Sequence, residues 1–266
     1  WERKRGLLNQ FNEYVLGKID NPFLVNTIDV KNIKYVITLD ADTSLTLNTA
    51  FELIGAMAHI LNKPILNEKK DLVIDGHALI QPRVGINIEA TNKSLFTKIF
   101  AGMGGIDAYS NAISDVYQDN FNEGIFTGKG IYDLEIFSKV LQNEIPENTV
   151  LSHDLLEGSY LRCCLATDIM LMDGYPTSYN SYKTRLHRWI RGDFQIARWA
   201  NRRIIDRKEK EKDNPLNTLS RYKIIDNLLR ALTPISIMLS FVLLTILKLT
   251  FSIKIGSFIT LLFICI

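Results

Sequence analysis

Residues 33–45 read IKYVITLDADTSL, an apolar and β-branched run that ends at two aspartates. A run without polar alternation is typical of a strand buried on both faces of a mostly parallel sheet. Side chains two residues apart in a strand point to the same side, so Asp40 and Asp42 are expected to converge beyond its carboxyl end. A hard divalent cation that also binds phosphate oxygens would relieve their repulsion. The alternative is a solvated loop in which Asp42 or Thr43 caps the next helix.

The composition limits the class of protein only broadly. The chain has 266 residues, and its 31 basic and 29 acidic side chains give a net charge of +2, which provides no reason to expect nucleic acid as a partner. The three cysteines lack the spacing of a metal site or a disulfide framework, which favours a reducing compartment. The chain starts at Trp1 rather than Met and ends inside an apolar run, so we expect a segment of a longer protein.

Hydrophobic periodicity outside residues 33–45 predicts alternating helices and strands. We predict helices over residues 1–16, 46–62 and 134–141 and from residue 93 onward, and strands over residues 76–84 and 168–172. The helix from residue 93 is expected to run into the glycine cluster Gly102, Gly104 and Gly105. This order of elements indicates an α/β domain.

Two further stretches carry groups suited to chemistry. The loop at residues 121–133, FNEGIFTGKGIYD, places Lys129 between Gly128 and Gly130, and glycines allow a ligand to approach the backbone closely. The pattern lacks the spacing of a Walker loop. Residues 151–165 read LSHDLLEGSYLRCCL, where Ser152 is a candidate helix cap and Asp154 and Glu157 share one helical face.

Residues 183–203, KTRLHRWIRGDFQIARWANRR, combine arginines with aromatic side chains. This pattern suits phosphate recognition or a membrane surface with aromatic rings at the headgroup level. The alternative is a charged helix face over an aromatic core. We expect residues 181–227 to form a basic helical segment that follows an α/β domain over residues 1–180.

Residues 228–266 are expected to hold one or two transmembrane helices. Residues 231–247, ALTPISIMLSFVLLTIL, contain no charge, and a second apolar run starts at Leu249. A buried core helix is the alternative. Basic residues crowd the side before the first span, so the positive-inside tendency places the globular part in the cytoplasm.

Five blocks in this order, YVITLDADT, QPRV, FTGKGIYD, LSHDLLEG and HRWIRGDFQ, resemble the glycosyltransferase domain of cyclic β-1,2-glucan synthases. That domain is related to the processive family-2 glycosyltransferases. The resemblance implies a GT-A fold whose N-terminal, uridine-binding part precedes this chain. It also implies UDP-glucose as donor, a β-glucan acceptor, Mg²⁺ or Mn²⁺, inversion at the anomeric carbon, a bacterial inner membrane and further domains in a larger parent.

The resemblance assigns roles to individual acidic residues. Asp40 and Asp42 match the DxD that faces the UDP diphosphate through the metal, and Asp154 matches the general base. Family-2 enzymes usually keep Thr-Glu-Asp at the base, whereas Ser152 and His153 precede it here. His153 is expected to be a structural neighbour of the base.

Donor and acceptor contacts follow from the same resemblance. Arg188 and Trp189 match the RW of QxxRW, but Arg185 stands at the position of the Gln. For the donor diphosphate we expect Arg188, Arg191 and Lys4, and for the acceptor Trp189, Gly128, Lys129 and Gln195.

Other functions fit parts of the sequence. Another processive enzyme could make a β-1,3-glucan, a β-1,4-glucan or an N-acetylglucosamine polymer. The linkage depends on how the acceptor is held, and the sequence does not show that geometry. A phosphatase of the haloacid dehalogenase type also opens with an apolar strand and DxD, although Ser44 stands where that class has Thr or Val. A membrane-anchored pseudo-transferase that only binds glucan is the non-enzymatic alternative.

Overall fold

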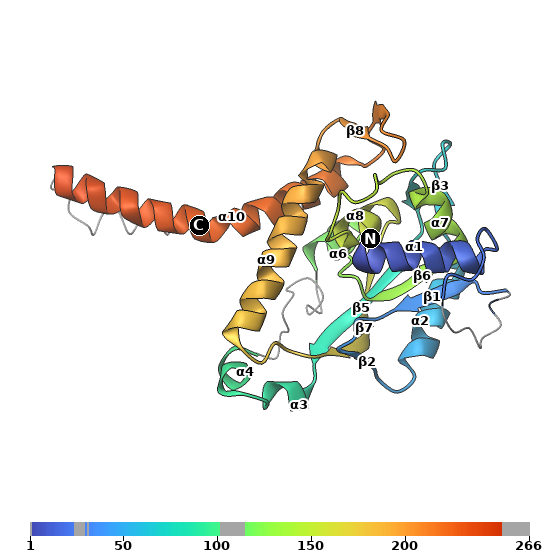
Figure 1. The fold of residues 1–266 in the computed structure, drawn as a ribbon, viewed down its shortest axis with the longest axis horizontal. Helices are drawn as coiled ribbons and strands as arrows, with labels where there is room; N and C mark the ends of the chain where they lie inside the picture. Colours follow the sequence, from blue (N-terminus) through green and yellow to red (C-terminus); the bar gives the residue numbers. More distant parts are fainter. Residues whose placement is uncertain (1, 24–29, 31, 102–114, 252–266) are drawn as a thin grey trace. The chain divides into compact units, whose positions relative to one another are not determined.

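The computed structural model describes residues 2–23, 30, 32–101 and 115–251, with side chains up to Ile246 (Figure 1). The chain divides into two compact units, Trp1–Ile224 and Ile225–Ile266. The first unit contains the sheet and the helices that pack on it. The predicted glycine cluster at Gly102, Gly104 and Gly105 lies outside the described residues.

A curled five-stranded sheet forms the centre of the first unit. Its strands are β1 (Tyr35–Thr38), β6 (Gly130–Asp133), β5 (Leu79–Ile86), β7 (Cys164–Asp173) and β2 (Thr43–Leu45), in this spatial order. Among the described strands only β5 and β7 pair in parallel, and the other three pairings are antiparallel. The predicted α/β class is confirmed, but the mostly parallel sheet is wrong, because buried apolar strands look alike whichever way their neighbours run.

Residues 33–45 form two short strands rather than one. β1 ends at Thr38 and β2 begins at Thr43, and these strands lie at opposite edges of the sheet. Tyr35, Val36 and Ile37 are only half-buried, so the prediction of a strand buried on both faces is wrong. Extended residues advance about 3.5 Å each, so the two edges approach each other at the turn of residues 39–42. This acidic turn carries Asp40 and Asp42.

The predicted helices are found close to their expected positions. They correspond to α1 (Arg3–Val15), α2 (Thr49–Ala58), α4 (Leu95–Phe100) and α7 (Leu134–Leu141). The remaining described helices are α3 (Ile88–Thr91), α6 (Val116–Phe121), α8 (Asp154–Tyr160), α9 (Tyr179–Ile196) and α10 (Thr218–Phe251), with 3-10 turns at Ile60–Asn62 and Ala197–Ala200. Two small hairpins pair β3 (Ile65–Leu66) with β4 (Val73–Asp75) and β8 (Arg203–Ile205) with β9 (Glu211–Asp213).

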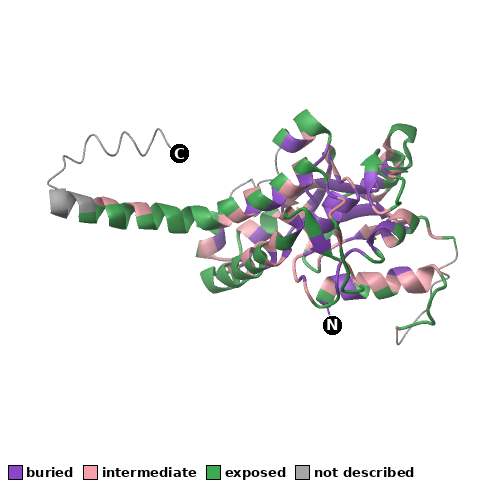
Figure 2. Ribbon diagram, turned by 90° about the horizontal axis from the view of Figure 1, so that it is seen from above, coloured by how far each residue is buried: buried purple, intermediate pink, exposed green. Residues whose placement is uncertain are grey.

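Helices cover both faces of the sheet. Leu79 on β5 joins the larger core cluster with α7 and α8, whereas its neighbour Ile80 joins a smaller cluster with Leu53 and Met57 of α2. This alternation follows from the two-residue period of a strand. Figure 2 shows the buried residues concentrated in the sheet and the helices beside it. Burial on both faces therefore belongs to the central strand β5 rather than to the edge strands β1 and β2 that flank the acidic turn.

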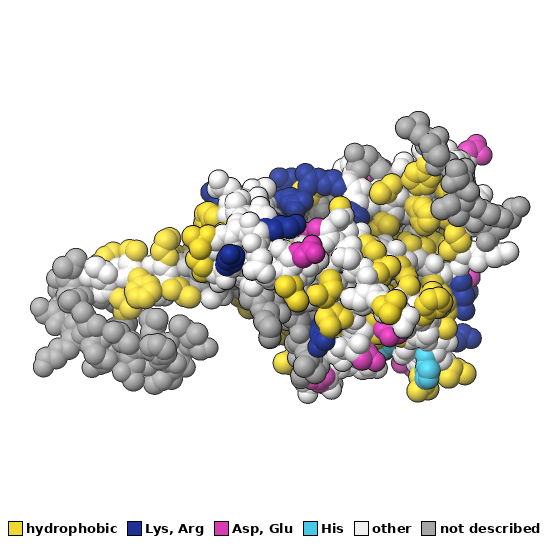
Figure 3. Space-filling view, turned by 90° about the horizontal axis from the view of Figure 1, so that it is seen from below, with side chains coloured by type: hydrophobic (Ala, Val, Ile, Leu, Met, Phe, Trp, Pro, Cys, Tyr) yellow, Lys and Arg dark blue, Asp and Glu magenta, His cyan; other side chains and the backbone are white. Residues whose placement is uncertain are grey.

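Large hydrophobic side chains are also exposed. On α2 and its flanking turns these are Leu47, Phe51, Ile54, Ile60 and Leu61. Figure 3 shows such side chains spread over one face of the molecule, together with clusters of Lys and Arg. Scattered exposed apolar residues are normal in proteins, so these carry no functional assignment.

The described residues of the second unit, from Ile225 to Phe251, continue α10. The segment Thr218–Ile246 contains 29 residues, is long and apolar enough to cross a membrane, and has none of its apolar window buried. One candidate span is therefore found in the described part of the chain. The second span predicted from Leu249 falls largely on residues outside it.

Candidate active site

The acidic turn is held by cations from distant parts of the chain. Lys4 on α1 places its Nζ 2.5 Å from Asp40 Oδ1, and Lys129, just before β6, places its Nζ 3.6 Å from Asp40 Oδ2. Arg185 on α9 donates from Nη2 to Asp42 Oδ2 at 2.8 Å. Burial opposes ionisation of Asp42, but the hydrogen bond and charge of Arg185 outweigh it and lower the pKa of Asp42. The two aspartates share one neighbourhood, with separate partners.

Lys129 sits between three carboxylates. Its side chain is 13% exposed, and its ammonium pairs with Asp173 as well as with Asp40. Burial lowers the pKa of Lys129, but Asp173, Asp40 and Asp42 together raise it above the ordinary value. Lys129 was expected on the acceptor side. The structure places its ammonium on the carboxylate side, and its acceptor role stays a prediction.

Asp173 is a site residue that the sequence reasoning missed. It ends β7 opposite Thr43, the first residue of β2, and accepts a 2.5 Å hydrogen bond from the Thr43 hydroxyl. An aspartate at the end of a strand-like run is the signal that marked Asp40, so the MLMD stretch ending at Asp173 offered a similar clue.

Asp154 lies against the same loop that supports Asp40. A Cβ added at Gly128 would lie 2.8 Å from Asp154 Oδ1, and Gly128 has a φ of +90°. The Gly128 carbonyl accepts hydrogen bonds from Lys4 at 2.7 Å and from the Thr38 hydroxyl at 3.3 Å. Gly128 therefore lies against Asp154 and also binds Lys4, which in turn binds Asp40.

The environment of Asp154 is partly desolvated. Its side chain is 28% exposed. Burial raises the pKa of Asp154, the charge of His153 opposes this rise, and Glu157 adds to it. The charge of Lys4 lowers the pKa of Asp154, whereas the charge of Asp40 raises it. The four groups belong to one electrostatic cluster.

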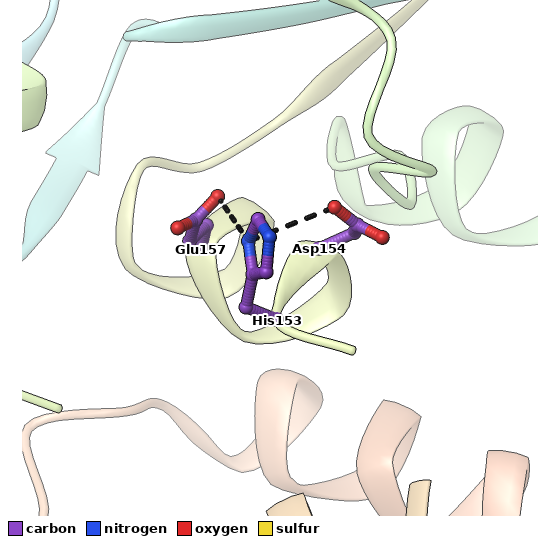
Figure 4. Close-up of side chains that lie close together, drawn as sticks. All are labelled: His153, Asp154 and Glu157. Atoms are coloured by element: carbon purple, nitrogen blue, oxygen red, sulfur yellow. Dashed lines mark ion pairs between the residues drawn. The ribbon is translucent and has the colours of Figure 1, made fainter. Parts of the chain in front are cut away.

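His153 and Glu157 lie next to Asp154 at the start of α8 (Figure 4). His153 Nδ1 is 2.9 Å from Glu157 Oε2 and 3.7 Å from Asp154 Oδ1. His153 is the N-cap residue of α8 and makes no side-chain cap bond. The prediction that Ser152 caps this helix is therefore wrong, because Ser152 instead packs tightly against Gly192 of α9.

Helix α9 presents several of the predicted donor and acceptor residues. A cavity of about 550 Å³ beside Asp42 is lined by Lys93, Tyr175, Ser181, Arg185 and Arg188, among others. Arg191 is exposed, and Trp189 is 37% exposed. Lys93 and Ser181 were not singled out from the sequence, since neither lies in a motif. The cavity gives Arg188 a place beside the acidic turn.

Other residues of the basic segment are structural. Gln195 Oε1 accepts a 2.9 Å hydrogen bond from the backbone N–H of Leu151, so its side chain supports the loop before Asp154. Its contact with the acceptor stays a prediction. Trp199 is fully buried, whereas Phe194 is 51% exposed. The aromatic-core alternative thus holds for Trp199.

The chemistry of the acidic turn fits a hard divalent cation. Asp40 and Asp42 offer carboxylate oxygens, and Mg²⁺ commonly binds one or two carboxylates together with substrate phosphates. In the structure, Lys4 pairs with Asp40 and Arg185 pairs with Asp42, so both carboxylates already bind positively charged groups. Asp40 and Asp42 are the residues that would hold the ion.

Comparison with known proteins gives one informative relationship. The chain is 43% identical over 238 residues to the "Cyclic beta-(1,2)-glucan synthase NdvB" of Rhizobium meliloti (strain 1021), a match that covers 89% of this chain and 8% of that protein. No protein-family model matches the chain. The chain is therefore related to a short segment of a cyclic β-1,2-glucan synthase, which confirms the resemblance inferred from its motifs.

Proposed function

We propose, from this relationship, that the chain carries catalytic residues of an inverting glycosyltransferase. The enzyme would transfer glucose from UDP-glucose to a growing β-1,2-glucan, and the fold would be part of a GT-A domain. The observation that carries the proposal is the position of Asp154 against Gly128, whose carbonyl binds the lysine that also binds Asp40. A single displacement requires the base and the donor-binding turn to face one site, and this shared contact through Gly128 and Lys4 supports that arrangement.

In this proposal Asp154 is the general base. Its ionised carboxylate accepts the proton of the acceptor 2-hydroxyl as that oxygen attacks the anomeric carbon of the donor. The glycosyl bond to UDP breaks as the new bond forms, and inversion follows from this single displacement. Partial burial strengthens the carboxylate as a base because it raises the pKa of Asp154.

Cationic side chains bind the departing diphosphate. Arg188 lines the cavity beside Asp42, and Lys4 contacts Asp40. Guanidinium and ammonium groups form strong, charge-assisted hydrogen bonds with phosphate oxygens. Arg191 is exposed on the same helix and would add to this charge. Mg²⁺ or Mn²⁺ bound to Asp40 and Asp42 would supply Lewis-acid stabilisation of the leaving group.

The acceptor would lie on the side of Trp189. This ring is 37% exposed, so it offers an apolar face for a glucose unit. Gly128 lets the loop at residues 121–133 pass directly beside Asp154. How the acceptor is held decides between a β-1,2 linkage and the β-1,3 or β-1,4 linkages of related polymers. Methylation analysis of the product distinguishes these.

A location at the bacterial inner membrane, with the site in the cytoplasm, completes the proposal. Support comes from the candidate span Thr218–Ile246 and from the basic residues that precede it. A cytoplasmic site would meet a nucleotide-activated sugar.

The test is the Asp154→Asn variant in membranes of cells that express the complete reading frame. Glucose incorporation from labelled UDP-glucose and UDP release should both fall by at least about 10²-fold, since general-base catalysis typically contributes 10²- to 10⁴-fold. Glu135→Gln, a neutralised and exposed carboxylate on α7, is the matched control. Wild-type glucan synthesis by Asp154→Asn would refute the assignment and favour a binding protein.

A further inference from the structure

The buried side of Asp154 contains a charge pair that the transfer reaction does not use directly. The side chains of His153 and Glu157 are 5% and 2% exposed, compared with 28% for Asp154. Figure 4 shows the imidazole between the two carboxylates. His153 Nδ1 approaches Glu157 Oε2 to 2.9 Å without the angular geometry of a hydrogen bond, so the contact is mainly electrostatic. Neither His153 nor Glu157 is exposed enough to touch a sugar.

The charge balance favours a protonated imidazole. Two carboxylates flank one imidazole, and burying both as anions without a cation is costly. Burial alone lowers the pKa of His153, but the charges of Glu157 and Asp154 raise it to about 9. A metal ligand must be a neutral imidazole. This cluster is therefore better suited to holding a proton than a metal ion, even though its ligand atoms lie within 4.8 Å of one another.

Groups from neighbouring elements do not overturn this balance. From α1, the positive charge of Arg5 lowers the pKa of His153. Arg5 is itself buried in a 2.6 Å ion pair with Glu2. Lys4 and Asp40 face Asp154 with opposite signs. On β6, the Tyr132 hydroxyl donates to Asn12 and its raised pKa keeps it neutral near Glu157. The imidazolium is the cation nearest to both carboxylates of α8 among the described residues.

We propose that His153 and Glu157 are positioning residues for the base: Glu157 holds a protonated His153 beside Asp154, and this charge keeps the Asp154 carboxylate ionised and in place under Gly128. The inference rests on the proposed function, since it concerns the same base. It differs from a purely structural ion pair in one consequence. Removal of the imidazolium must change the pH at which Asp154 becomes active as well as the stability of α8.

The main test compares pH profiles of glucan synthesis in membranes that contain the complete protein. With saturating UDP-glucose, His153→Gln should move the acid limb of the rate profile up by about 1–2 pH units, because an opposite charge at this distance lowers a carboxyl pKa by 1–3 units. Glu157→Gln should shift it less, since Glu157 acts on Asp154 through His153 and also repels it directly. Glu157→Asp, which retains the charge, should restore most of the wild-type profile. An unmoved acid limb in His153→Gln would refute the positioning role.

A second measurement needs no variant and no activity. Hydrogen–deuterium exchange at histidine C2, followed by mass spectrometry, reports the pKa of each histidine in the wild-type protein. We expect His153 to titrate well above its ordinary value and His77 below it, because burial lowers the pKa of His77. A His153 that titrates at or below 6.5 would overturn the proposal even where the variants fail to fold.

The two proposals fail in different ways. An active Asp154→Asn protein would refute the base itself and the positioning role with it, while the exchange measurement would still reveal whether the ion pair exists. An inactive Asp154→Asn protein combined with an unmoved His153→Gln profile would refute only the positioning role.

Discussion

Gly128→Ala is a sharp test of the geometry that joins Asp154 to the acidic turn. The added Cβ would lie 2.8 Å from Asp154 Oδ1 and 3.0 Å from Cγ, whereas ordinary contacts begin near 3.4 Å. The carboxyl group must therefore move by roughly 0.5 Å, and displacements near 1 Å can cost 10²-fold in rate. We expect a 10- to 100-fold loss of transfer. The positive φ of +90° adds backbone strain of about 1–2 kcal/mol.

Gly17→Ala separates strain from displacement. Gly17 also has a positive φ, +69°, but nothing lies within 4 Å of an added Cβ, so this variant carries backbone strain alone. Initial rates of UDP release at saturating UDP-glucose should be measured for both variants in membranes with the complete protein, alongside thermal unfolding. Both variants should lose stability through the strained φ, while only Gly128→Ala should lose most of its rate. Equal rates in the two variants would contradict the placement of Asp154 under this loop.

Two further outcomes follow from the buried charges. Lys129→Met should lower the free energy of unfolding by about 3 kcal/mol, measured by chemical denaturation, because it removes the ammonium that faces Asp40 and Asp173; a loss under 1 kcal/mol would contradict this. His153 has a folded pKa of about 9, above its unfolded value of about 6.5. Its stabilisation, about 3 kcal/mol, should be complete below pH 6.5 and lost as pH rises through 9, and Glu157→Gln should abolish most of that dependence.

Local patterns predicted the elements well because helix and strand periodicity are properties of a few neighbouring residues. The helices around Leu53 and Phe137 and the β5 strand appear where apolar spacing places them. Strand direction and edge position depend on pairing with distant residues, so the run before Asp40 was wrongly assigned to the interior of a parallel sheet. The β8–β9 hairpin was missed because its sequence is dominated by charge, with only Ile204 deeply buried.

The candidate site shows the same division. Asp40, Asp42 and Asp154 were found because each stands in a short motif, and the resemblance connected the motifs. The contacts among them are not encoded locally. Asp173 contributes through its pairing with Thr43 across the sheet edge, and Arg185 reaches Asp42 from a helix 143 residues later. Such partners can be identified only from the three-dimensional fold, because they are far apart in the sequence.

The acidic groups of the site are balanced by cationic side chains of the same chain. Three carboxylates, Asp40, Asp42 and Asp173, face three cations of the same chain, Lys4, Lys129 and Arg185. Removal of a cation would leave its carboxylate partly buried and without a compensating charge, which is strongly destabilising. The acidic turn is therefore held in shape by its own side chains before any ligand arrives. Because Lys4 also binds the carbonyl of Gly128, the same compensation fixes the loop against which Asp154 rests.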